Sequence, residues 1–362
     1  MSLEELYARA RRDVDDGLVP SCQLAVARDG ELIAFESFGN APAPRYVIFS
    51  ITKALVASAV WLLVSEEALT YETRVADVIP GFADNDKGRV TVDHLLLHTA
   101  GFPRAPMKPE EGADPDQRLA KFRTWRLDWE SGTKTEYHAT SAHWVLADVI
   151  ERVSGLDFRV FVNERICAAL DLDTLRLGFD SLDQRPINDV VIVGEPAQLG
   201  TVTRASGEQF TVPEIRDDIL LRYNEPKVRA AGVPGAGAVG SAADVAMLFQ
   251  AFVKNTNGLW KDEILADATR VVRNSFPDPY TTAPANRSRG LVLARDDGFA
   301  VVRGFGESVS PFSIASPGVG GQTAWADPVT GLSFCYLTNG IDADLVRAFR
   351  RSLGISNRAA AL

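Results

Sequence analysis

The sequence predicts an α+β protein in which strands from both ends of the chain form one antiparallel sheet, with a helical lobe inserted between them. Alternating apolar residues predict one hairpin near each end, at residues 23–38 and 321–337. Between these hairpins, apolar residues recur mainly at the spacing of helices. Strands that cluster at both ends, with helices filling the middle, favour a sheet that the two ends share.

The first 64 residues predict a helix, a hairpin and a second helix. The first 17 residues, MSLEELYARARRDVDDG, have the pattern of an amphipathic helix. Asp29-Gly30 lies between two alternating runs and is a strong signal for a two-residue hairpin turn. Residues 54–64 (ALVASAVWLLV) are apolar on every side, so we expect this second helix to be buried.

The middle of the chain predicts further helices. Thr91 has the position of an N-terminal cap for the segment VDHLLLHTAG, a helix expected to end at Gly101. Residues 141–154 have helical periodicity, and Gly155 follows as a stop signal. Residues 183–213 have a mixed pattern that predicts no particular structure, and they are a candidate lid.

The last third of the chain predicts a helix, the second hairpin and a terminal helix. A loop of small residues at 235–240 precedes Ser241, which is expected to begin the helix DVAMLFQAFVKN. The second hairpin turns at residues 327–331. The C-terminal helix is expected in the segment DADLVRAFRRSLG at 342–354.

Composition excludes several classes of function. The chain has 362 residues, 46% of them hydrophobic, which is enough for a large core. A net charge of -10, with no run rich in Lys or Arg, argues against a nucleic-acid partner. The three cysteines, Cys22, Cys167 and Cys335, lie far apart and are expected to be buried free thiols in a reducing cytoplasm. Four histidines without an HExxH pattern argue against a metal site, and we expect no cofactor.

Neither a leader nor a membrane span is predicted. The N-terminal segment lacks the basic start and apolar centre of a signal peptide. The longest apolar stretch, at residues 54–64, is too short to cross a bilayer. We therefore expect a cytoplasmic protein, while the sequence leaves the oligomeric state open.

Ser50-Ile51-Thr52-Lys53 directly precedes the apolar helix and is the strongest chemical signal in the chain. On a helix, a residue three positions on lies on the same face, so the Lys53 amine can reach the Ser50 hydroxyl. Burial disfavours the charged amine and makes it a usable base, while the amides at the helix N-terminus favour an oxyanion. The alternative is a serine that only caps the helix, with Lys53 reaching solvent. A second Ser-x-x-Lys, at 131–134, has the residues of a turn.

Two further segments carry candidate site residues. Tyr137 precedes a predicted helix, and as a tyrosinate near Lys53 it can take the proton of Ser50 and return it to a leaving group. The alternative is a tyrosine whose ring is packed in the core and whose hydroxyl is exposed to water. The glycines of residues 316–322 let a substrate approach the strand backbone, where an N–H can complete an oxyanion hole with the N–H of Ser50. A simple glycine-rich bulge is the alternative.

These segments, taken together, resemble the serine β-lactamase-related family, which includes class C β-lactamases, D-Ala-D-Ala peptidases and family VIII carboxylesterases. The segments that carry the resemblance occur in the expected order over nearly the whole chain. They are the opening hairpin, SITK at 50–53, LLLHTAGFP at 95–103, SGTKTEY at 131–137, NEPKVRAAGVPGAGAVGSAADVA at 224–246 and GVGGQTAWADPVTGLSFCYLTNG at 318–340. The last two look most like the esterase/lipase branch.

The resemblance implies a β-lactamase/transpeptidase-like fold, with an antiparallel sheet flanked by helices and an all-helical lobe. We expect a single catalytic domain, in which residues of roughly 1–50 and 235–362 form the α/β lobe and roughly 51–234 the helical lobe. The site is expected to lie between the lobes.

The resemblance also implies roles for single residues. Ser50 is the expected acylated nucleophile, with Lys53 and Tyr137 as the coupled base and acid. The backbone N–H groups of Ser50 and Val319 are the expected oxyanion donors. Gly318, Ser316 and His138 are the other candidates for contact with substrate.

The chain departs from the family pattern at two positions. The usual Tyr-x-Asn reads Tyr137-His138-Ala139, and the usual Lys-Thr-Gly or His-x-Gly reads Ser316-Pro317-Gly318. In relatives that recognise β-lactams, the missing side chains contact the amide and the carboxylate of the substrate. Their loss predicts a different substrate. His138 is a candidate replacement contact, and the alternative is a solvated loop histidine.

The sequence therefore predicts a serine carboxylesterase that acts on small-molecule esters of short or medium acyl chain through an acyl-enzyme on Ser50. An acyltransferase that uses the same acyl-enzyme is one alternative. A catalytically weak binding protein with the same fold is a second alternative, motivated by the two departures. Hydrolysis of amides or lactams is a third, and the lost polar anchors argue against it.

Overall fold

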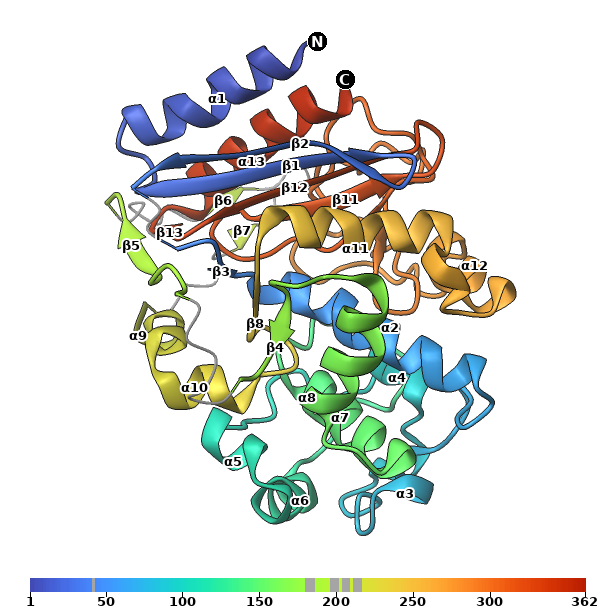
Figure 1. Cartoon of the computed structure of the whole chain (residues 1–362). Helices are drawn as coiled ribbons and strands as arrows, with labels where there is room; N and C mark the ends of the chain where they lie inside the picture. The colour runs from blue at the N-terminus through green and yellow to red at the C-terminus, as the bar shows by residue number, and fades with distance from the viewer. Residues whose placement is uncertain (41–42, 180–185, 196–201, 204–208, 211–216) are drawn as a thin grey trace.

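Strands from both ends of the chain meet in one six-stranded antiparallel sheet in the computed structural model of the protein (Figure 1). The model describes all residues except 41–42, 180–185, 196–201, 204–208 and 211–216. The sheet has the order β2-β1-β12-β11-β10-β9. Its strands are β1 (Ser21–Arg28), β2 (Glu31–Gly39), β9 (Val292–Leu293), β10 (Ile314–Ala315), β11 (Thr323–Asp327) and β12 (Leu332–Thr338). Because β1 pairs with β12, the predicted sheet shared by both ends is confirmed.

Tight turns at the predicted positions set the register of the two hairpins. Asp29 and Gly30 both have positive φ, 54° and 94°, as a two-residue hairpin turn between β1 and β2 requires. Gly331 has φ 71° at the turn between β11 and β12, and its carbonyl accepts a hydrogen bond from the N–H of Asp29. The two hairpins are thus joined at their turns as well as through β1 and β12.

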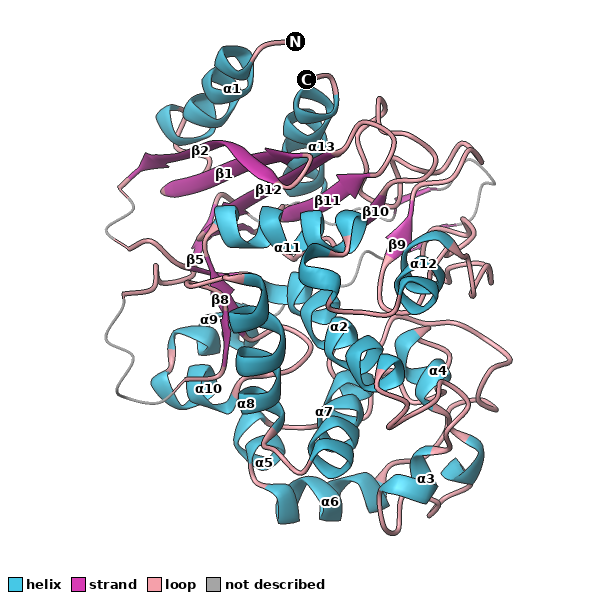
Figure 2. Cartoon of the chain, turned by 45° about the vertical axis from the view of Figure 1, so that its right-hand side comes forward, coloured by secondary structure: helices cyan, strands magenta, loops and turns pink. Residues whose placement is uncertain are grey.

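Helices cover both faces of this sheet (Figures 1 and 2). The helices α1 (Leu3–Asp15) and α13 (Leu345–Ala360) lie on one face, and α11 (Ala242–Lys254) lies on the other. Strand β12 is consequently buried along its whole length. The predicted terminal helices and the helix capped by Ser241 are confirmed, since the Ser241 side chain accepts a hydrogen bond from the N–H of Asp244.

A group of helices below the sheet surrounds α2, which is buried along nearly its whole length (Figure 2). The helices are α2 (Thr52–Ser65), α3 (Val75–Val78), α4 (Val92–Leu96), α5 (Pro109–Ala113), α6 (Pro115–Thr124), α7 (Ser141–Ser154), α8 (Phe158–Val162), α9 (Asp217–Leu221), α10 (Pro226–Ala231) and α12 (Asp262–Arg270). Single helical turns complete the set, at η1 (Phe49–Ile51), η2 (Lys87–Arg89), η3 (Asn163–Cys167), η4 (Ala168–Leu170), η5 (Arg222–Asn224) and η6 (Thr256–Gly258). Burial on all sides agrees with the uniformly apolar sequence of α2.

Short strand pairs connect the helices with the sheet. The strand β8 (Ala238–Gly240) pairs with β3 (Tyr46–Val47) and β4 (Arg176–Leu177). Of these, β3 lies shortly before Ser50 in the chain. The remaining pairs are β13 (Gly340–Asp342) with β5 (Val191–Val193), and β6 (Val202–Thr203) with β7 (Gln209–Phe210). The predicted loop at 235–240 therefore ends in a strand. Much of the candidate lid at 183–213 lies outside the described residues.

The helix expected to end at Gly101 is shorter than predicted. Thr91 caps it as expected, accepting a hydrogen bond from the N–H of His94, but α4 ends at Leu96. His98 then has a φ of 59°, in the left-handed region, which is incompatible with a continuing helix. The chain reverses at this residue, and His98 consequently lies at the cavity described below rather than on a helix face.

Within the described residues, no helix combines the length and the apolar character needed to cross a lipid bilayer. The three cysteines are buried and unpaired, as predicted.

Candidate active site

A strained turn delivers Ser50 to the start of α2. Strand β3 leads into this turn, where Phe49 has a φ of 43°. A left-handed conformation costs a residue with a side chain about 1–2 kcal/mol, so packing must hold Phe49 in place. Its ring is 1% exposed and meets the Tyr223 ring edge-on, with centroids 5.3 Å apart. Ser50 follows and lines a cavity.

The structure brings together the three side chains that the sequence singled out. The Lys53 Nζ donates a hydrogen bond to Ser50 Oγ at 3.1 Å, and the Tyr137 hydroxyl donates to the same oxygen at 2.9 Å. The Lys53 Nζ also donates to the carbonyl of Gly235 at 2.6 Å, which fixes the amine from its other side. Lys53 is only 3% exposed, so the alternative of a solvent-directed lysine is wrong.

The surroundings lower the pKa of both Lys53 and Tyr137. Burial lowers the pKa of the Lys53 amine from its ordinary 10.5, because the charged form loses its hydration. Burial alone would raise the pKa of Tyr137, but the positive charge of Lys53 and the hydrogen bond with Ser50 outweigh it, so the pKa falls below its ordinary 10.0. Both shifts favour losing a proton from the pair, which is the state that can accept the proton of Ser50.

The glycine-rich segment faces Ser50 across the cavity. The Ser316 hydroxyl donates a hydrogen bond to the backbone carbonyl of Ser50 at 3.1 Å, so it ties the two elements together. The N–H of Gly318 is already used, because it donates to the carbonyl of Gln322 at 3.0 Å. In the described part of the chain, the N–H of Val319 has no hydrogen-bond partner. The amide of Val319 is thus available to an oxyanion.

Close packing explains the glycine at position 318. A Cβ there would lie 3.1 Å from the carbonyl oxygen of Ile48 and 3.2 Å from the Gln322 side chain. Gln322 is buried, and its amide donates to the carbonyls of Val47 and Thr338 at 2.9 and 3.0 Å. The lack of a side chain at Gly318 therefore leaves room for these neighbours, and the residue lines the cavity.

The cavity around Ser50 has a volume of about 350 Å³. Beside the predicted residues, it is lined by seven others: His98, Asp278, Arg287, Gly290, Val292, Ala315 and Pro317. The His98 ring lies against the Tyr137 ring with centroids 4.8 Å apart, and the Arg287 guanidinium lies 5.3 Å from the centre of the same ring. Their positions depend on long-range packing, so no local motif signalled them.

His138 is not brought to the cavity. It is 0% exposed, so the alternative of a solvated loop histidine is wrong. Its Nε2 accepts a hydrogen bond from the N–H of Phe102 at 3.2 Å, and its Nδ1 lies 2.7 Å from the carbonyl of Glu136. Both ring nitrogens thus lie against backbone groups, and His138 is not among the residues that line the cavity.

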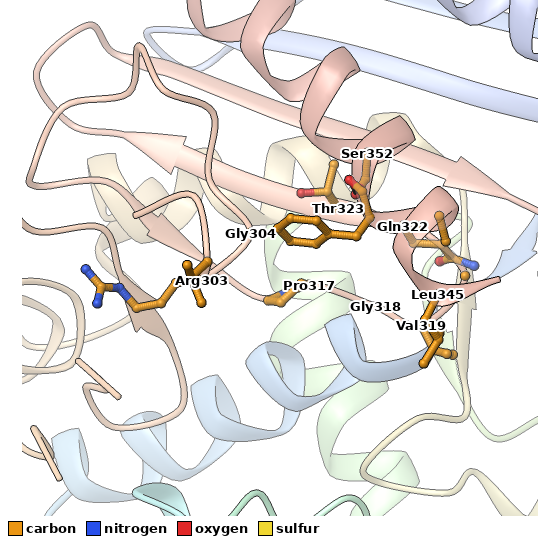
Figure 3. Close-up of a pocket in the computed structure, with 14 residues that line it drawn as sticks. Arg303, Gly304, Pro317, Gly318, Val319, Gln322, Thr323, Leu345 and Ser352 are labelled. Atoms are coloured by element: carbon orange, nitrogen blue, oxygen red, sulfur yellow. Dashed lines mark hydrogen bonds between the residues drawn. The ribbon is translucent and has the colours of Figure 1, made fainter. Parts of the chain in front are cut away.

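A second cavity, of about 270 Å³, lies on the far side of the glycine-rich segment (Figure 3). The two cavities share the residues 317–319. Val319 and Leu345 lie close together at one end of the second cavity, while Arg303 lies at the other and directs its guanidinium away from it (Figure 3). The second cavity is thus largely apolar and has residues 317–319 as a common wall with the first.

Comparison with known proteins assigns the chain to a family. The sequence profile described as Beta-lactamase matches residues 7–353, nearly the whole chain. The chain belongs to the beta-lactamase family of hydrolases. Ser50, Lys53 and Tyr137 accordingly lie within the matched region.

Relatives within the beta-lactamase family carry esterase and peptidase names. The esterase/beta-lactamase LipL of Mycobacterium tuberculosis (strain ATCC 25618 / H37Rv) is 26% identical over 320 residues, which are 83% of this chain and 70% of LipL. A putative D-alanyl-D-alanine carboxypeptidase of Escherichia coli (strain K12) is 25% identical over 365 residues, 91% of this chain and 80% of the relative. These names describe the relatives.

A solved structure of another protein has the same fold as this chain. The crystal structure of a family VIII carboxylesterase aligns with a TM-score of 0.78 at 23% identity, covering 98% of this chain and 97% of the other. The predicted β-lactamase/transpeptidase-like fold is thereby confirmed.

The two departures from the family pattern are visible in this beta-lactamase-family site. The Ser316 hydroxyl points to the Ser50 carbonyl and supplies no positive charge to the cavity. Ala139 is exposed and is not among the residues that line the cavity. Among the described residues, no cluster of three or more His, Cys, Asp or Glu side chains is arranged to hold a metal ion.

Proposed function

We propose that the protein is a serine carboxylesterase that hydrolyses esters of short or medium acyl chain through an acyl-enzyme on Ser50. One observation carries the proposal: Ser50 Oγ accepts hydrogen bonds from both Lys53 and Tyr137, at 3.1 and 2.9 Å. A serine hydroxyl becomes a competent nucleophile when a positioned base removes its proton. The lowered pKa values of Lys53 and Tyr137 support that role.

In the first half-reaction, Ser50 Oγ attacks the ester carbonyl carbon while its proton passes to the deprotonated Lys53–Tyr137 pair. The carbonyl π-bond pair moves to oxygen, and the N–H groups of Ser50 and Val319 stabilise the resulting oxyanion. When the intermediate collapses, the C–O bond to the alcohol breaks. Tyr137 then donates the proton to the leaving oxygen, which leaves the acyl group on Ser50.

In the second half-reaction, water replaces the alcohol. The Lys53–Tyr137 pair accepts a proton from the water as its oxygen attacks the acyl carbon. Collapse of the second intermediate breaks the bond to Ser50 Oγ, which takes the proton back. The carboxylic acid is released, and the three side chains return to their starting state.

Two features of the cavity support an ester rather than a β-lactam. Ala139 does not supply the side-chain amide that the resemblance associates with β-lactam recognition, and it lies outside the cavity. A substrate amide therefore lacks that partner, which discriminates against a β-lactam. The esterase name of LipL and the apolar space beyond Val319 agree with an ester of modest chain length.

The test is the initial rate of hydrolysis of p-nitrophenyl acetate, butyrate and octanoate. Wild type is expected to turn over at least the two shorter esters, and Ser50→Ala to reduce the rate by about 10⁴-fold or more. Ser131→Ala is the matched control, because it removes the serine of the second Ser-x-x-Lys, which lies away from the cavity. Retention of most activity by Ser50→Ala would show that the proposal is wrong.

A further inference from the structure

The guanidinium of Arg287 is a cation at the catalytic cavity, and among the described residues its contact is with the Tyr137 ring. The residue lines the cavity that contains Ser50 and Tyr137. Its side chain lies over the Tyr137 ring, but in the described part of the chain it makes no hydrogen bond and no ion pair. Removing a charged group from water is costly unless an opposite charge or hydrogen-bond acceptors compensate it.

Other buried arginines of the protein have such compensation. Three of them, Arg118, Arg289 and Arg351, pair with carboxylates at distances typical of good hydrogen bonds. The pairs are Arg118 with Asp148 at 2.8 Å, Arg289 with Asp93 at 2.6 Å, and Arg351 with Asp342 at 3.1 Å. Arg287 stands apart from this set, although it is only two residues from Arg289.

The backbone around Arg287 is firmly anchored. Residues 274–287 form a two-stranded ribbon, in which the N–H of Arg287 donates to the carbonyl of Asn274 at 2.9 Å. The Asn274 side chain in turn donates to the carbonyl of Leu97 at 2.8 Å and to the hydroxyl of Thr135 at 2.9 Å. The ribbon is thus bound to the segments that carry His98 and Tyr137, and it holds the cation at a fixed place.

Asp278 is a carboxylate in the same cavity wall, and its negative charge acts on the guanidinium without direct contact. Its Oδ1 accepts hydrogen bonds from the N–H groups of Tyr280 and Thr281, at 3.0 and 2.9 Å. It forms no ion pair with Arg287 in the described structure. A bound anion can therefore approach the guanidinium without displacing a protein partner.

We propose that Arg287 determines specificity by binding a carboxylate of the substrate. The preferred substrate is then an ester whose alcohol part carries a carboxylate. A guanidinium presents paired donors that match the two oxygens of a carboxylate. The carboxylate is assigned to the alcohol part because Arg287 lies over the ring of Tyr137. Tyr137 protonates the departing alcohol in the proposed function, on which this inference rests. The cation thus comes from the 274–287 ribbon rather than from position 316.

The test compares 3- and 4-carboxyphenyl acetate with the uncharged 3- and 4-carbamoylphenyl acetates. Wild type is expected to favour a carboxyphenyl ester in kcat/KM. Arg287→Gln should lower the ratio of charged to uncharged substrate by about 10- to 100-fold, the worth of a hydrogen bond to a charged group. Arg287→Lys should restore part of the ratio. Arg270→Gln, which removes the same charge from the exposed end of α12, should leave the ratio at its wild-type value.

Two results would overturn the assignment. One is a wild type without preference for the charged esters. The other is an Arg287→Gln variant that loses both substrates equally, which would make the arginine a support for Tyr137 only. Binding of 3-hydroxybenzoate by calorimetry gives a readout without turnover: wild type and Ser50→Ala should bind it and Arg287→Gln should not. Failure of ester turnover with intact binding would count against the proposed function alone.

Discussion

Ser50 Oγ accepts hydrogen bonds from two side chains whose pKa values are both lowered by their surroundings. Neither an N-terminal cap nor a packed surface tyrosine requires this convergence. Lys53 loses hydration through burial, while its charge lowers the pKa of Tyr137. At the residue scale the account therefore makes two predictions, one on the side chains and one on pH.

Removing either partner of Ser50 should slow hydrolysis strongly while the fold persists. Lys53→Met and Tyr137→Phe should each lower kcat by about 10²- to 10⁴-fold, the usual contribution of a positioned acid or base. Both keep most of the side-chain volume, so circular dichroism and the unfolding transition should stay close to wild type. Near-normal kcat in either variant would remove that residue from the mechanism.

The rate should rise with pH as the Lys53–Tyr137 pair loses a proton. The ordinary pKa values are 10.5 for lysine and 10.0 for tyrosine, and both are lowered here. The acidic limb of kcat/KM against pH should therefore have its midpoint below these values, with activity falling as pH drops through it. The profile is measured with a neutral ester, so the substrate does not titrate. A midpoint at or above 10 would contradict the lowered pKa values.

Local spacing made Ser50, Lys53 and Tyr137 predictable from sequence. A serine and a lysine three residues apart at a helix start must share a face, whatever the rest of the fold. Arg287 and His98 escaped prediction because their places depend on a ribbon and on a left-handed turn that no nearby residue signals. Adjacency to Tyr137 likewise does not reveal that the His138 ring is fully buried.

At the scale of elements, the segment after Arg287 is pressed against α2. Gly290 has a φ of 105°, and a Cβ there would lie 2.2 Å from the Cβ of Ala57. Ala57 is one helical turn beyond Lys53, so this contact sets the distance between the catalytic helix and the wall that carries Arg287.

Gly290→Ala should therefore be costly. A left-handed alanine costs about 1–2 kcal/mol, and overpacking adds about 1–3 kcal/mol. Gly298→Ala is the matched control, because Gly298 also has positive φ, 79°, but has open space around it. Urea unfolding should show the larger loss for Gly290→Ala, together with a lower kcat/KM. Equal losses in the two variants would mean that the contact with Ala57 is unimportant.

Most elements followed from periodicity and turn residues. The Asp29-Gly30 turn, the uniformly apolar α2 and the cap at Ser241 each depend on a few neighbouring residues, and the structure has them where predicted. The end of α4 did not follow, because the sequence continues to look helical to Gly101 while the backbone turns at His98. The pairing of β8 with β3 and β4 is long-range and left no local signal.

At the scale of the whole molecule, a group of buried histidines next to the site is expected to make the free energy of unfolding depend on pH. The centroid of the His98 ring lies 5.9 Å from that of His138 and 5.9 Å from that of His143. Burial lowers the pKa of all three, to about 4 for His138 and well below 6.5 for the others. Both ring nitrogens of His143 lack a hydrogen-bond partner in the described structure.

The protein should consequently lose stability as pH falls below about 6.5. In that range the histidines become protonated in the unfolded chain while they stay neutral in the fold, so the unfolded state binds more protons. The loss for His138 continues down to about pH 4, at up to about 1.4 kcal/mol per pH unit. Urea unfolding at pH 7.5 and at pH 5 measures it.

Carboxylates also titrate at low pH, and the variant His143→Leu distinguishes their contribution to the loss of stability from that of the histidines. The variant removes one buried base without leaving a partner unsatisfied, because His143 has none. Its free energy of unfolding should fall less between pH 7.5 and pH 5 than that of wild type. The same fall in both proteins would show that His143 does not contribute to acid lability.

The most direct test of the central claim is the mass of the intact protein after rapid mixing with p-nitrophenyl butyrate and quenching in acid. We expect wild type to gain the mass of one butyryl group, and peptide mapping to locate it on Ser50. The Ser50→Ala variant should gain nothing. A wild type that turns over the ester without a trapped acyl group on Ser50, or an adduct that persists in Ser50→Ala, would contradict the account.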